Sequence, residues 1–209
     1  ASDVYKRQIV GIISAFAFPQ IMDWNKSRAV KTDVIRVVNI FDNINSQVQR
    51  GLYAFAQVYM NFEIDQDTGI TTLTVTSRGM TADTLGNKIT QDMTFRSETD
   101  RCSLDREDWD HDGADTDRAE VSQEILNNIE TNFNGEEAVC FSKDGRWYST
   151  SNFFQGSNSF EMSGRGGVCD DQDEKGPQCD YRIVWSRFGN IKLEKWNERK
   201  GESGEWVSQ

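Results

Sequence analysis

The chain has few of the residues that build the common catalytic and metal sites. A single histidine, His111, occurs in 209 residues, so a zinc site built on histidine has little support. No cysteine pair has the CxxC spacing. No serine–histidine–aspartate order, glycine-rich phosphate loop or HExxH helix is present either. We therefore expect the protein not to be an enzyme.

Proline and basic residues are also scarce. The two prolines, Pro19 and Pro177, leave no proline-rich linker between domains. The chain has 23 Lys and Arg against 34 Asp and Glu, and its net charge is −11. Because a phosphate backbone attracts cations, this composition disfavours nucleic acid as a partner. Six Trp and twelve Phe, by contrast, supply enough apolar surface for a compact core.

The four cysteines all lie in the second half of the chain, at positions 102, 140, 169 and 179. An even number in an acidic, Trp-rich and Gly-rich region favours two disulfides formed outside the cytoplasm, with reduced core thiols as the alternative. Four cysteines allow three connectivities. Cys169–Cys179 flanks a short polar loop and is the preferred pair, which leaves Cys102–Cys140 by elimination.

The chain lacks a hydrophobic run long enough to cross a bilayer, which takes about twenty residues. Residues 1–8 are polar, residues 9–18 are apolar, and Pro19 follows. A signal peptide is disfavoured because no clean cleavage site of small residues follows. Apolar residues instead recur at helical spacing from Ile21 to Leu52. We predict a helix from residue 9 to a limit between residues 51 and 57, kinked at Pro19, although 52–64 also alternates as a strand would.

Beyond this helix the pattern is typical of strands joined by tight turns. Three hairpins are predicted, with strands at 59–64 and 70–76, at 138–142 and 146–149, and at 181–185 and 191–196. A short helix is predicted from an N-cap at Asp117, with Val121, Ile125 and Ile129 on one face. The polar tail 197–209 is expected to be loosely held, with Trp206 as its anchor.

Together these elements predict an α+β fold with two parts. Residues 1–51 form a long N-terminal helix kinked at Pro19, and residues 52–209 form a globular head rich in antiparallel strands. A helix this long cannot pack along its whole length on so small a head. Its N-terminal portion should protrude, and its apolar end should seek lipid or other copies of the chain.

The segment Gly-Ile-Ile-Ser-Ala-Phe-Ala-Phe-Pro-Gln at residues 11–20 resembles the N-terminal helix of type IV pilins and type II secretion pseudopilins. An ordinary buried helix with a proline kink is the alternative. The resemblance implies a pilin-like fold and a filament subunit, assembled from the inner membrane onto the bacterial surface. Its partners would be copies of itself and other pilins. The residues expected in the filament core are Ile9, Val10, Ile12, Ile13, Phe16, Phe18, Pro19, Ile21, Trp24, Val34, Val38 and Phe41.

Two stretches of the head are similar to the C-terminal hairpins of GspH/FimT-type minor pilins and pseudopilins. They are Cys-Phe-Ser-Lys-Asp-Gly-Arg at residues 140–146 and the segment 181–192. Polar residues 1–8, with Lys6 and Arg7, stand where the family carries apolar residues. This departure indicates a truncated, chimeric or misassembled start of the sequence.

One acidic segment has the spacing of a calcium loop. Asp108, Asp110 and Asp112 alternate before Gly113, and Ca²⁺ requires this density of oxygen ligands. The carbonyl of Ala114 would be the next ligand. Position twelve of the pattern is Ala119, which cannot bind the ion, so Asp115, Asp117 or Glu120 would replace it. The alternative is a solvated acidic loop without metal.

The sequence therefore predicts a structural subunit of an extracellular type IV pilus-like filament, which polymerises through its N-terminal helix. A pseudopilin of a type II secretion system is an alternative within the same family. Another alternative is a membrane-anchored module for Ca²⁺-dependent binding or adhesion, which would use the same helix as its anchor. An extracellular enzyme is the third.

Overall fold

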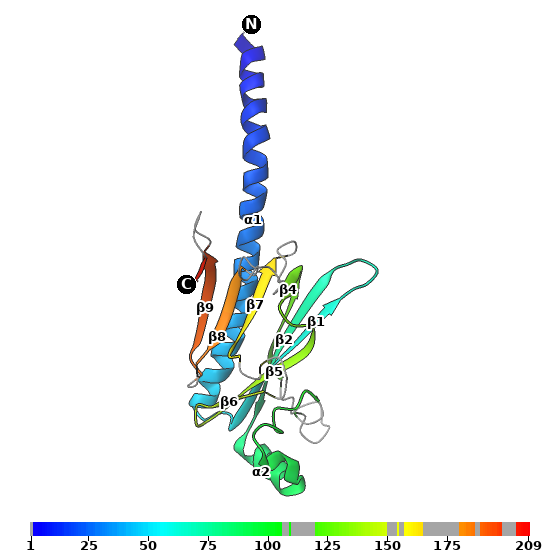
Figure 1. Cartoon of the computed structure of the whole chain (residues 1–209), viewed down its shortest axis with the longest axis vertical. Coiled ribbons are helices and arrows are strands. Elements are labelled where there is room, and N and C mark those ends of the chain that lie inside the picture. The colour runs from blue at the N-terminus through cyan, green and yellow to red at the C-terminus, as the bar shows by residue number, and fades with distance from the viewer. Residues whose placement is uncertain are drawn as a thin grey trace.

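The computed structural model describes residues 2–105, 109, 120–149, 154, 157–164, 180–186, 189–197 and 204–209, without the side chains of residues 2–24, 26, 94 and 120. Its fold is α+β, with one long N-terminal helix followed by antiparallel sheets in the C-terminal region. This confirms the expected fold class. Helix α1 (Ser2–Gln49) extends well beyond the ends of the strands (Figure 1).

Helix α1 ends two residues before the predicted limit, at a Schellman motif. The Leu52 N–H donates to the Gln47 carbonyl at 3.0 Å, and the Gly51 N–H donates to the Val48 carbonyl at 2.9 Å. Gly51 takes the left-handed conformation that this motif needs, with φ of 79°. Strand β1 begins soon afterwards at Phe55, so most of the alternating stretch 52–64 is strand.

The first sheet has five antiparallel strands in the order β3-β2-β1-β5-β6. Its strands are β1 (Phe55–Ile64), β2 (Thr71–Met80), β3 (Glu120–Asn127), β5 (Gly135–Ser142) and β6 (Trp147–Tyr148). The predicted hairpins at 59–76 and 138–149 are both present, and the first is longer than expected because its ladder runs from Ile64↔Thr71 to Phe55↔Met80.

The second sheet also has five antiparallel strands, in the order β10-β9-β8-β7-β4. Its strands are β4 (Ile129–Thr131), β7 (Ser159–Gly164), β8 (Tyr181–Trp185), β9 (Ile191–Asn197) and β10 (Glu205–Ser208). The predicted hairpin of 181–196 is therefore confirmed. The chain crosses from the first sheet to the second between β3 and β4, at Asn128, whose φ is 60°.

The short helix predicted from Asp117 is wrong over its described residues. Residues 120–127 form β3 and residues 129–131 form β4, whereas Asp117 itself lies outside the described residues. The spacing of Val121 and Ile125 fits a helix, but the open edge of β2 offers β3 a full ladder of hydrogen bonds. The strand buries Leu126 at 1% exposure and leaves Ile125 57% exposed, so the predicted apolar face was also wrong.

Helix α2 (Ala82–Gln91) and the 3-10 helix η1 (Met93–Arg96) were not predicted. Thr81 is the N-cap of α2, where its hydroxyl accepts a hydrogen bond from the Thr84 N–H. The cap pattern and the spacing of Leu85 and Ile89 are sequence signals that would have found this helix.

The C-terminal tail is held more firmly than expected in its last residues. Strand β10 pairs with β9, and the rings of Trp196 and Trp206 lie 5.3 Å apart. The Arg182 guanidinium lies 4.5 Å from the centre of the Trp206 ring, in a cation–π contact. Trp206 is thus the anchor that was predicted, while the strand around it was not.

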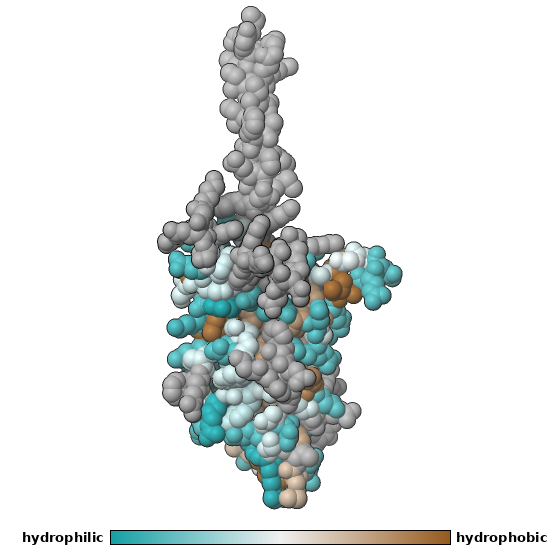
Figure 2. Space-filling view, viewed as in Figure 1, coloured by the Kyte–Doolittle hydropathy of each residue, from teal (hydrophilic) through white to brown (hydrophobic). Residues whose placement is uncertain are grey.

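The main core lies where the C-terminal part of α1 meets both sheets (Figure 1). Polar side chains cover most of the described outer surface of the head in the view of Figure 2. The helix contributes one fully or almost fully buried face, formed by Val34, Val37, Ile40, Phe41, Ile44 and Val48. This part of α1 therefore belongs to the head and not to a separate helical domain.

Candidate functional site

Helix α1 has two parts with different surroundings. From Val30 to Gln49 it packs in the head, and residues 2–24 continue the helix beyond the strands (Figure 1). At 1.5 Å per residue the 48-residue helix is about 72 Å long, and about 40 Å of it precedes Val30. The backbone is helical through Pro19, and the kink there remains a prediction.

The residues predicted for the filament core divide between these two parts. The projecting part contains Ile9, Val10, Ile12, Ile13, Phe16, Phe18, Pro19, Ile21 and Trp24, whose side chains are not among those described. Val34 and Phe41 are instead fully buried in the head, and Val38 packs against the same core. These three residues stabilise the subunit's own fold, because the sheets cover the helix face on which they lie. Val34 and Phe41 are thus fully covered within the subunit, whereas Val38 is only partly covered.

An aromatic cluster holds α1 in the head. The ring of Phe41 stacks on Trp185 with centroids 5.8 Å apart, and it also contacts Phe160 at 5.9 Å. Trp185 is itself edge-on to Trp147 at 5.7 Å and Phe154 at 5.2 Å. Rings at these distances each contribute about 0.5–1.5 kcal/mol beyond the area that they bury. The cluster therefore joins the helix to strands of both sheets.

A buried polar contact fixes the position of α1 along the β8–β9 turn. The Asn45 amide donates to the Gly189 carbonyl at 2.6 Å. Gly189 has a φ of 75°, and a Cβ added there would lie 2.7 Å from Asn45 Oδ1. Only glycine fits both the backbone conformation and this close approach. The sequence analysis placed a turn here but did not connect it to the helix.

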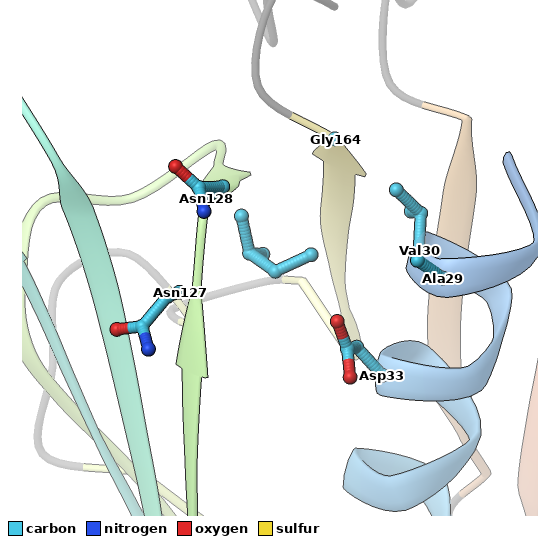
Figure 3. A pocket seen from close by; sticks show the side chains of 7 residues that line it. Ala29, Val30, Asp33, Asn127, Asn128 and Gly164 are labelled. Carbon is cyan, nitrogen blue, oxygen red and sulfur yellow. The ribbon is translucent and has the colours of Figure 1, made fainter. Parts of the chain in front are cut away.

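A cleft lies where α1 leaves the head (Figure 3). Its volume is about 380 Å³, and it is lined by Ala29, Val30, Asp33, Asn127, Asn128, Ile129 and Gly164. Burial raises the pKa of Asp33 above its usual 3.8; Arg36 opposes this shift and Glu124 adds to it. Among the described residues of the lining, Asp33 is the one that ionises. The cleft is thus a mainly uncharged recess beside the projecting helix.

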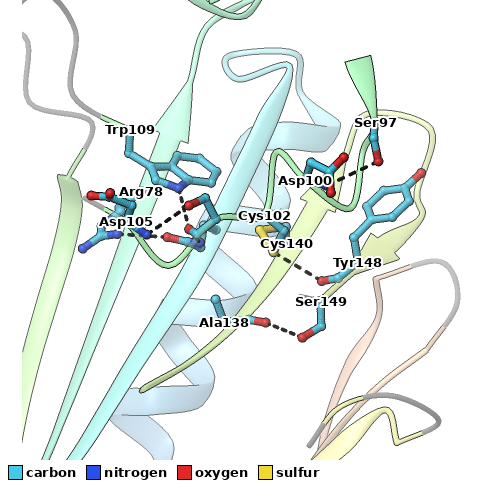
Figure 4. The surroundings of a disulfide bond; sticks show 12 residues. Arg78, Ser97, Asp100, Cys102, Asp105, Trp109, Ala138, Cys140, Tyr148 and Ser149 are labelled. Atoms are coloured by element: carbon cyan, nitrogen blue, oxygen red, sulfur yellow. Dashed lines mark hydrogen bonds between the residues drawn. A yellow bond between two sulfur atoms is a disulfide. The ribbon is translucent and has the colours of Figure 1, made fainter. Parts of the chain in front are cut away.

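A second, smaller core covers the other face of the first sheet, at the end of the head opposite the projecting helix (Figures 1 and 4). Side chains alternate between the two faces of a strand, so Ala56 belongs to the main core and its neighbour Phe55 to the smaller one. Residues 82–105 and Trp109 supply side chains that pack on this face. The buried residues of this smaller core are Phe55, Met80, Phe95, Cys102, Trp109, Ala138 and Cys140.

A disulfide joins this segment to the sheet. Cys102 and Cys140 are bonded, with their Cα atoms 5.7 Å apart and a sequence separation of 38. This is the pair that the sequence left by elimination. The preferred pair Cys169–Cys179 lies outside the described residues. The Tyr148 hydroxyl donates to the Glu98 carboxylate beside the disulfide, and this bond ties the same segment to β6.

Trp109 is a buried anchor beside this segment. Trp109 lies near the disulfide (Figure 4), and its indole N–H donates to the Ser103 carbonyl at 3.0 Å. Its ring stacks on Phe55 at 6.0 Å. The Gln57 amide donates to the same carbonyl at 2.6 Å, and Arg78 donates to the Gln57 side chain at 3.1 Å. Trp109 is only 1% exposed. A tryptophan between two aspartates was a visible signal for such an anchor, and the sequence analysis did not use it.

Trp109 lies inside the predicted calcium loop. The ligands expected there, Asp108, Asp110, Asp112, Ala114, Asp115 and Asp117, fall outside the described residues. Within the described ranges, no group of three or more His, Cys, Asp or Glu side chains could hold a metal ion. The structure does show that the loop starts beside a buried tryptophan and ends where β3 begins at Glu120. Both ends of the predicted loop are therefore attached to the same sheet.

Comparison with models of protein families, with curated proteins and with solved structures found no match to this chain. Among the described residues, no helix is long and apolar enough to cross a membrane.

Proposed function

We propose that the protein is a structural subunit of an extracellular type IV pilus-like filament, and that it polymerises through the projecting part of α1. One observation carries this proposal. The helix continues for about 40 Å beyond the head, and the part that projects includes the apolar residues 9–18. An isolated helix is marginally stable in water, and an exposed apolar surface marks an interaction site. Packing against the same segment of other copies would bury it.

The rest of the molecule fits this role. The aromatic cluster around Phe41 and the Asn45–Gly189 contact fix the helix rigidly in the head. The disulfide closes the opposite end of the head, where it would resist unfolding under mechanical load. In this proposal the chain is held in the inner membrane before assembly. It then polymerises with copies of itself and with other pilins, and the filament extends from the bacterial surface. Its role is structural and not catalytic.

We also propose Ca²⁺ as a ligand of the acidic loop 108–120. The alternating aspartates supply the charge and oxygen donors that Ca²⁺ prefers. Attachment of the loop at Trp109 and at β3 would limit the entropy lost when the ion orders it. Bound Ca²⁺ would then stiffen the end of the head that carries the disulfide.

Electron cryomicroscopy of the native material tests the filament proposal. We expect a helical polymer in which residues 9–24 lie at the axis and the β-rich heads form the outer surface. Isolated copies bound to lipid through α1 would contradict the proposal and favour an anchored binding module.

A matched pair of variants adds a solution test. Phe16→Asp should keep the full-length chain in the supernatant under conditions in which the parent sediments as filaments, because a carboxylate is costly in an apolar helix interface. Asn43→Asp also adds one carboxylate to α1, but at an exposed position within the head and outside the apolar segment, and it should polymerise like the parent. Equal polymerisation of all three chains would exclude α1 as the contact.

A further inference from the structure

The part of α1 that packs in the head has one face that the sheets leave uncovered. We call the upper part of this face, where α1 leaves the sheets, the α1 stripe; its exposed residues are Arg28, Lys31, Thr32, Ile35, Arg36 and Asn39, and the exposed Asp42 follows below them on the same side. At 100° per residue these positions cluster on one side of the helix, opposite the buried side of Val34 and Phe41. Ile35 is 40% exposed in the middle of the stripe. The stripe thus combines an exposed apolar side chain with three cations, of which Arg36 also pairs with Asp33 at 3.4 Å.

This basic stripe belongs to an acidic protein. Residues 1–51 contain seven Lys and Arg against four Asp and Glu, although the whole chain carries a net charge of −11. Residues 1–51 therefore have a net charge of +3, whereas residues 52–209 have a net charge of −14. Such segregation favours contacts between the helix of one copy and the head of another, because opposite potentials attract and steer the encounter.

The tip of the β1–β2 hairpin has the complementary character. It projects from the head near the level at which α1 leaves the sheets (Figure 1). Glu63, Asp65 and Asp67 are exposed there. Ile64 and Ile70 flank the turn at 56% and 39% exposure, and Figure 2 shows apolar and hydrophilic surface side by side at this tip. These five residues define the hairpin tip.

The hairpin tip is ordered before any contact forms. Asp65 Oδ1 accepts hydrogen bonds from the N–H groups of Asp67 and Thr68, both at 2.9 Å. The Gly69 N–H donates to the Asp65 carbonyl at 2.7 Å, with Gly69 at a φ of 64°. The two backbone N–H bonds lower the pKa of Asp65, which keeps its carboxylate charged at neutral pH. A turn closed in this way loses little entropy on binding.

We propose that the hairpin tip of one copy docks on the α1 stripe of a second copy, so that Ile64 and Ile70 meet Ile35 and the surrounding charges pair. The inference rests on the filament proposal and identifies the contact between neighbouring heads. Tip and stripe are different surfaces of one chain, so the contact is heterologous. A heterologous contact that does not close into a ring continues as an open helical polymer.

Charge reversal on each surface tests this contact. We expect Arg28→Glu with Lys31→Glu to raise the critical concentration for polymerisation about ten-fold or more, since like charges then face each other. Glu63→Lys with Asp67→Lys should have a similar effect. Asp65 is left unchanged because it builds the turn. A chain with all four substitutions restores opposite charges across the contact, and its critical concentration should return to within about three-fold of the parent value.

Controls separate a specific contact from an effect of net charge. Lys143→Glu with Lys192→Glu makes the same charge change at exposed positions outside the stripe, and it should polymerise like the parent. The stripe reversal combined with Asp83→Lys and Asp100→Lys has the net charge of the four-fold variant but an unchanged tip, and it should not be rescued. Thermal unfolding followed by circular dichroism checks that each variant is folded.

The outcomes are distinct. Normal polymerisation of the stripe reversal, or a failure of the four-fold variant to recover, overturns the docking proposal while the filament proposal stands. A parent chain that never polymerises overturns both. Sedimentation with vesicles of anionic phospholipid gives a further arm. If the stripe reversal abolishes vesicle binding and leaves polymerisation unchanged, the stripe binds lipid and the docking proposal is wrong.

Discussion

Along α1, residues 30–49 lie against two sheets, whereas the backbone of residues 2–24 continues as helix beyond the ends of the strands (Figure 1). Both parts contain apolar residues at helical spacing. In the head the spacing produces one buried face, and the opposite face carries Arg28, Lys31 and Arg36. The comparison teaches that the same amphipathic pattern can serve either the fold of a subunit or its assembly. Which of the two it serves depends on what covers the helix.

A pair of phenylalanine substitutions should separate the two parts most strongly. Phe41→Ala removes the ring that stacks on Trp185, and we expect it to lower the free energy of unfolding of the head by about 3–5 kcal/mol. The melting temperature should fall by about 10 °C. Phe16→Ala should leave head melting unchanged and weaken polymerisation. Thermal denaturation and sedimentation of the full-length chains measure both effects. Equal loss of head stability in both variants would contradict the division of α1.

The disulfide allows the comparison to be extended to the far end of the head. Cys102→Ser with Cys140→Ser removes a covalent link over 38 residues, and we expect a loss of about 2–5 kcal/mol. Polymerisation at low temperature should persist, because α1 packs on the opposite face of the first sheet. Guanidinium denaturation with and without reductant measures the loss. Reductant should not lower the stability of the double variant through this bond, because the variant lacks it. A parent chain whose stability is equally unaffected by reductant would argue against a stabilising Cys102–Cys140 disulfide.

The predicted calcium loop lies at the same end and should also act on head stability alone. Asp110→Ala with Asp112→Ala should lower the melting temperature of the head only when Ca²⁺ is present. Saturation at 100 times the dissociation constant stabilises a folded protein by about 2.7 kcal/mol, and the variant should lose this gain. Asp170→Ala with Asp171→Ala changes the charge equally in an acidic run without the calcium spacing, and it is the control. Equal melting temperatures of parent and variant in excess Ca²⁺ would contradict the proposal that the loop binds Ca²⁺.

Asp33 should give the smallest effect, at the junction between the two parts of α1. Burial raises its folded-state pKa above 3.8, so the protonated carboxyl group contributes stability that is fully present below the unfolded pKa and is lost as the pH rises through the folded pKa. Asp33→Asn should therefore raise the melting temperature slightly at pH 7 and have no such benefit near pH 3. Melting curves across this range test the sign. A stabilisation that grows toward low pH would contradict the burial of this group.

Much of the fold was predictable because it follows from local patterns. The hairpins around residues 65–69 and 143–145 combine alternating strands with strong turn residues, and both are present. The helix predicted at Val121 and Ile125 failed because a spacing of four residues does not distinguish a short helix from a strand with a bulge. The ladder shifts register at Ser77/Arg78, which leaves Val121 as the extra residue.

The residues of the candidate site can be read from the sequence, but the contacts between them could not be predicted from it. A tryptophan at position 109, a glycine at 189 and an asparagine at 45 are visible in the sequence. Their roles depend on partners far away in the chain: Phe55 for the tryptophan, and each other for the glycine and the asparagine. Spacing along one segment carries no information about such contacts.

The sequence by itself determined the long helix, the β-rich head and the strong excess of acid, because periodicity, turn residues and charge are local properties. Only the tertiary structure decided that Val34 and Phe41 are buried in the subunit's own core and that Arg28 and Lys31 lie on the uncovered face. The physical reason is that a helix presents every side of its cylinder to possible partners. Which side is buried is settled when two sheets close over it and bury apolar area, at about 25 cal/mol per Å².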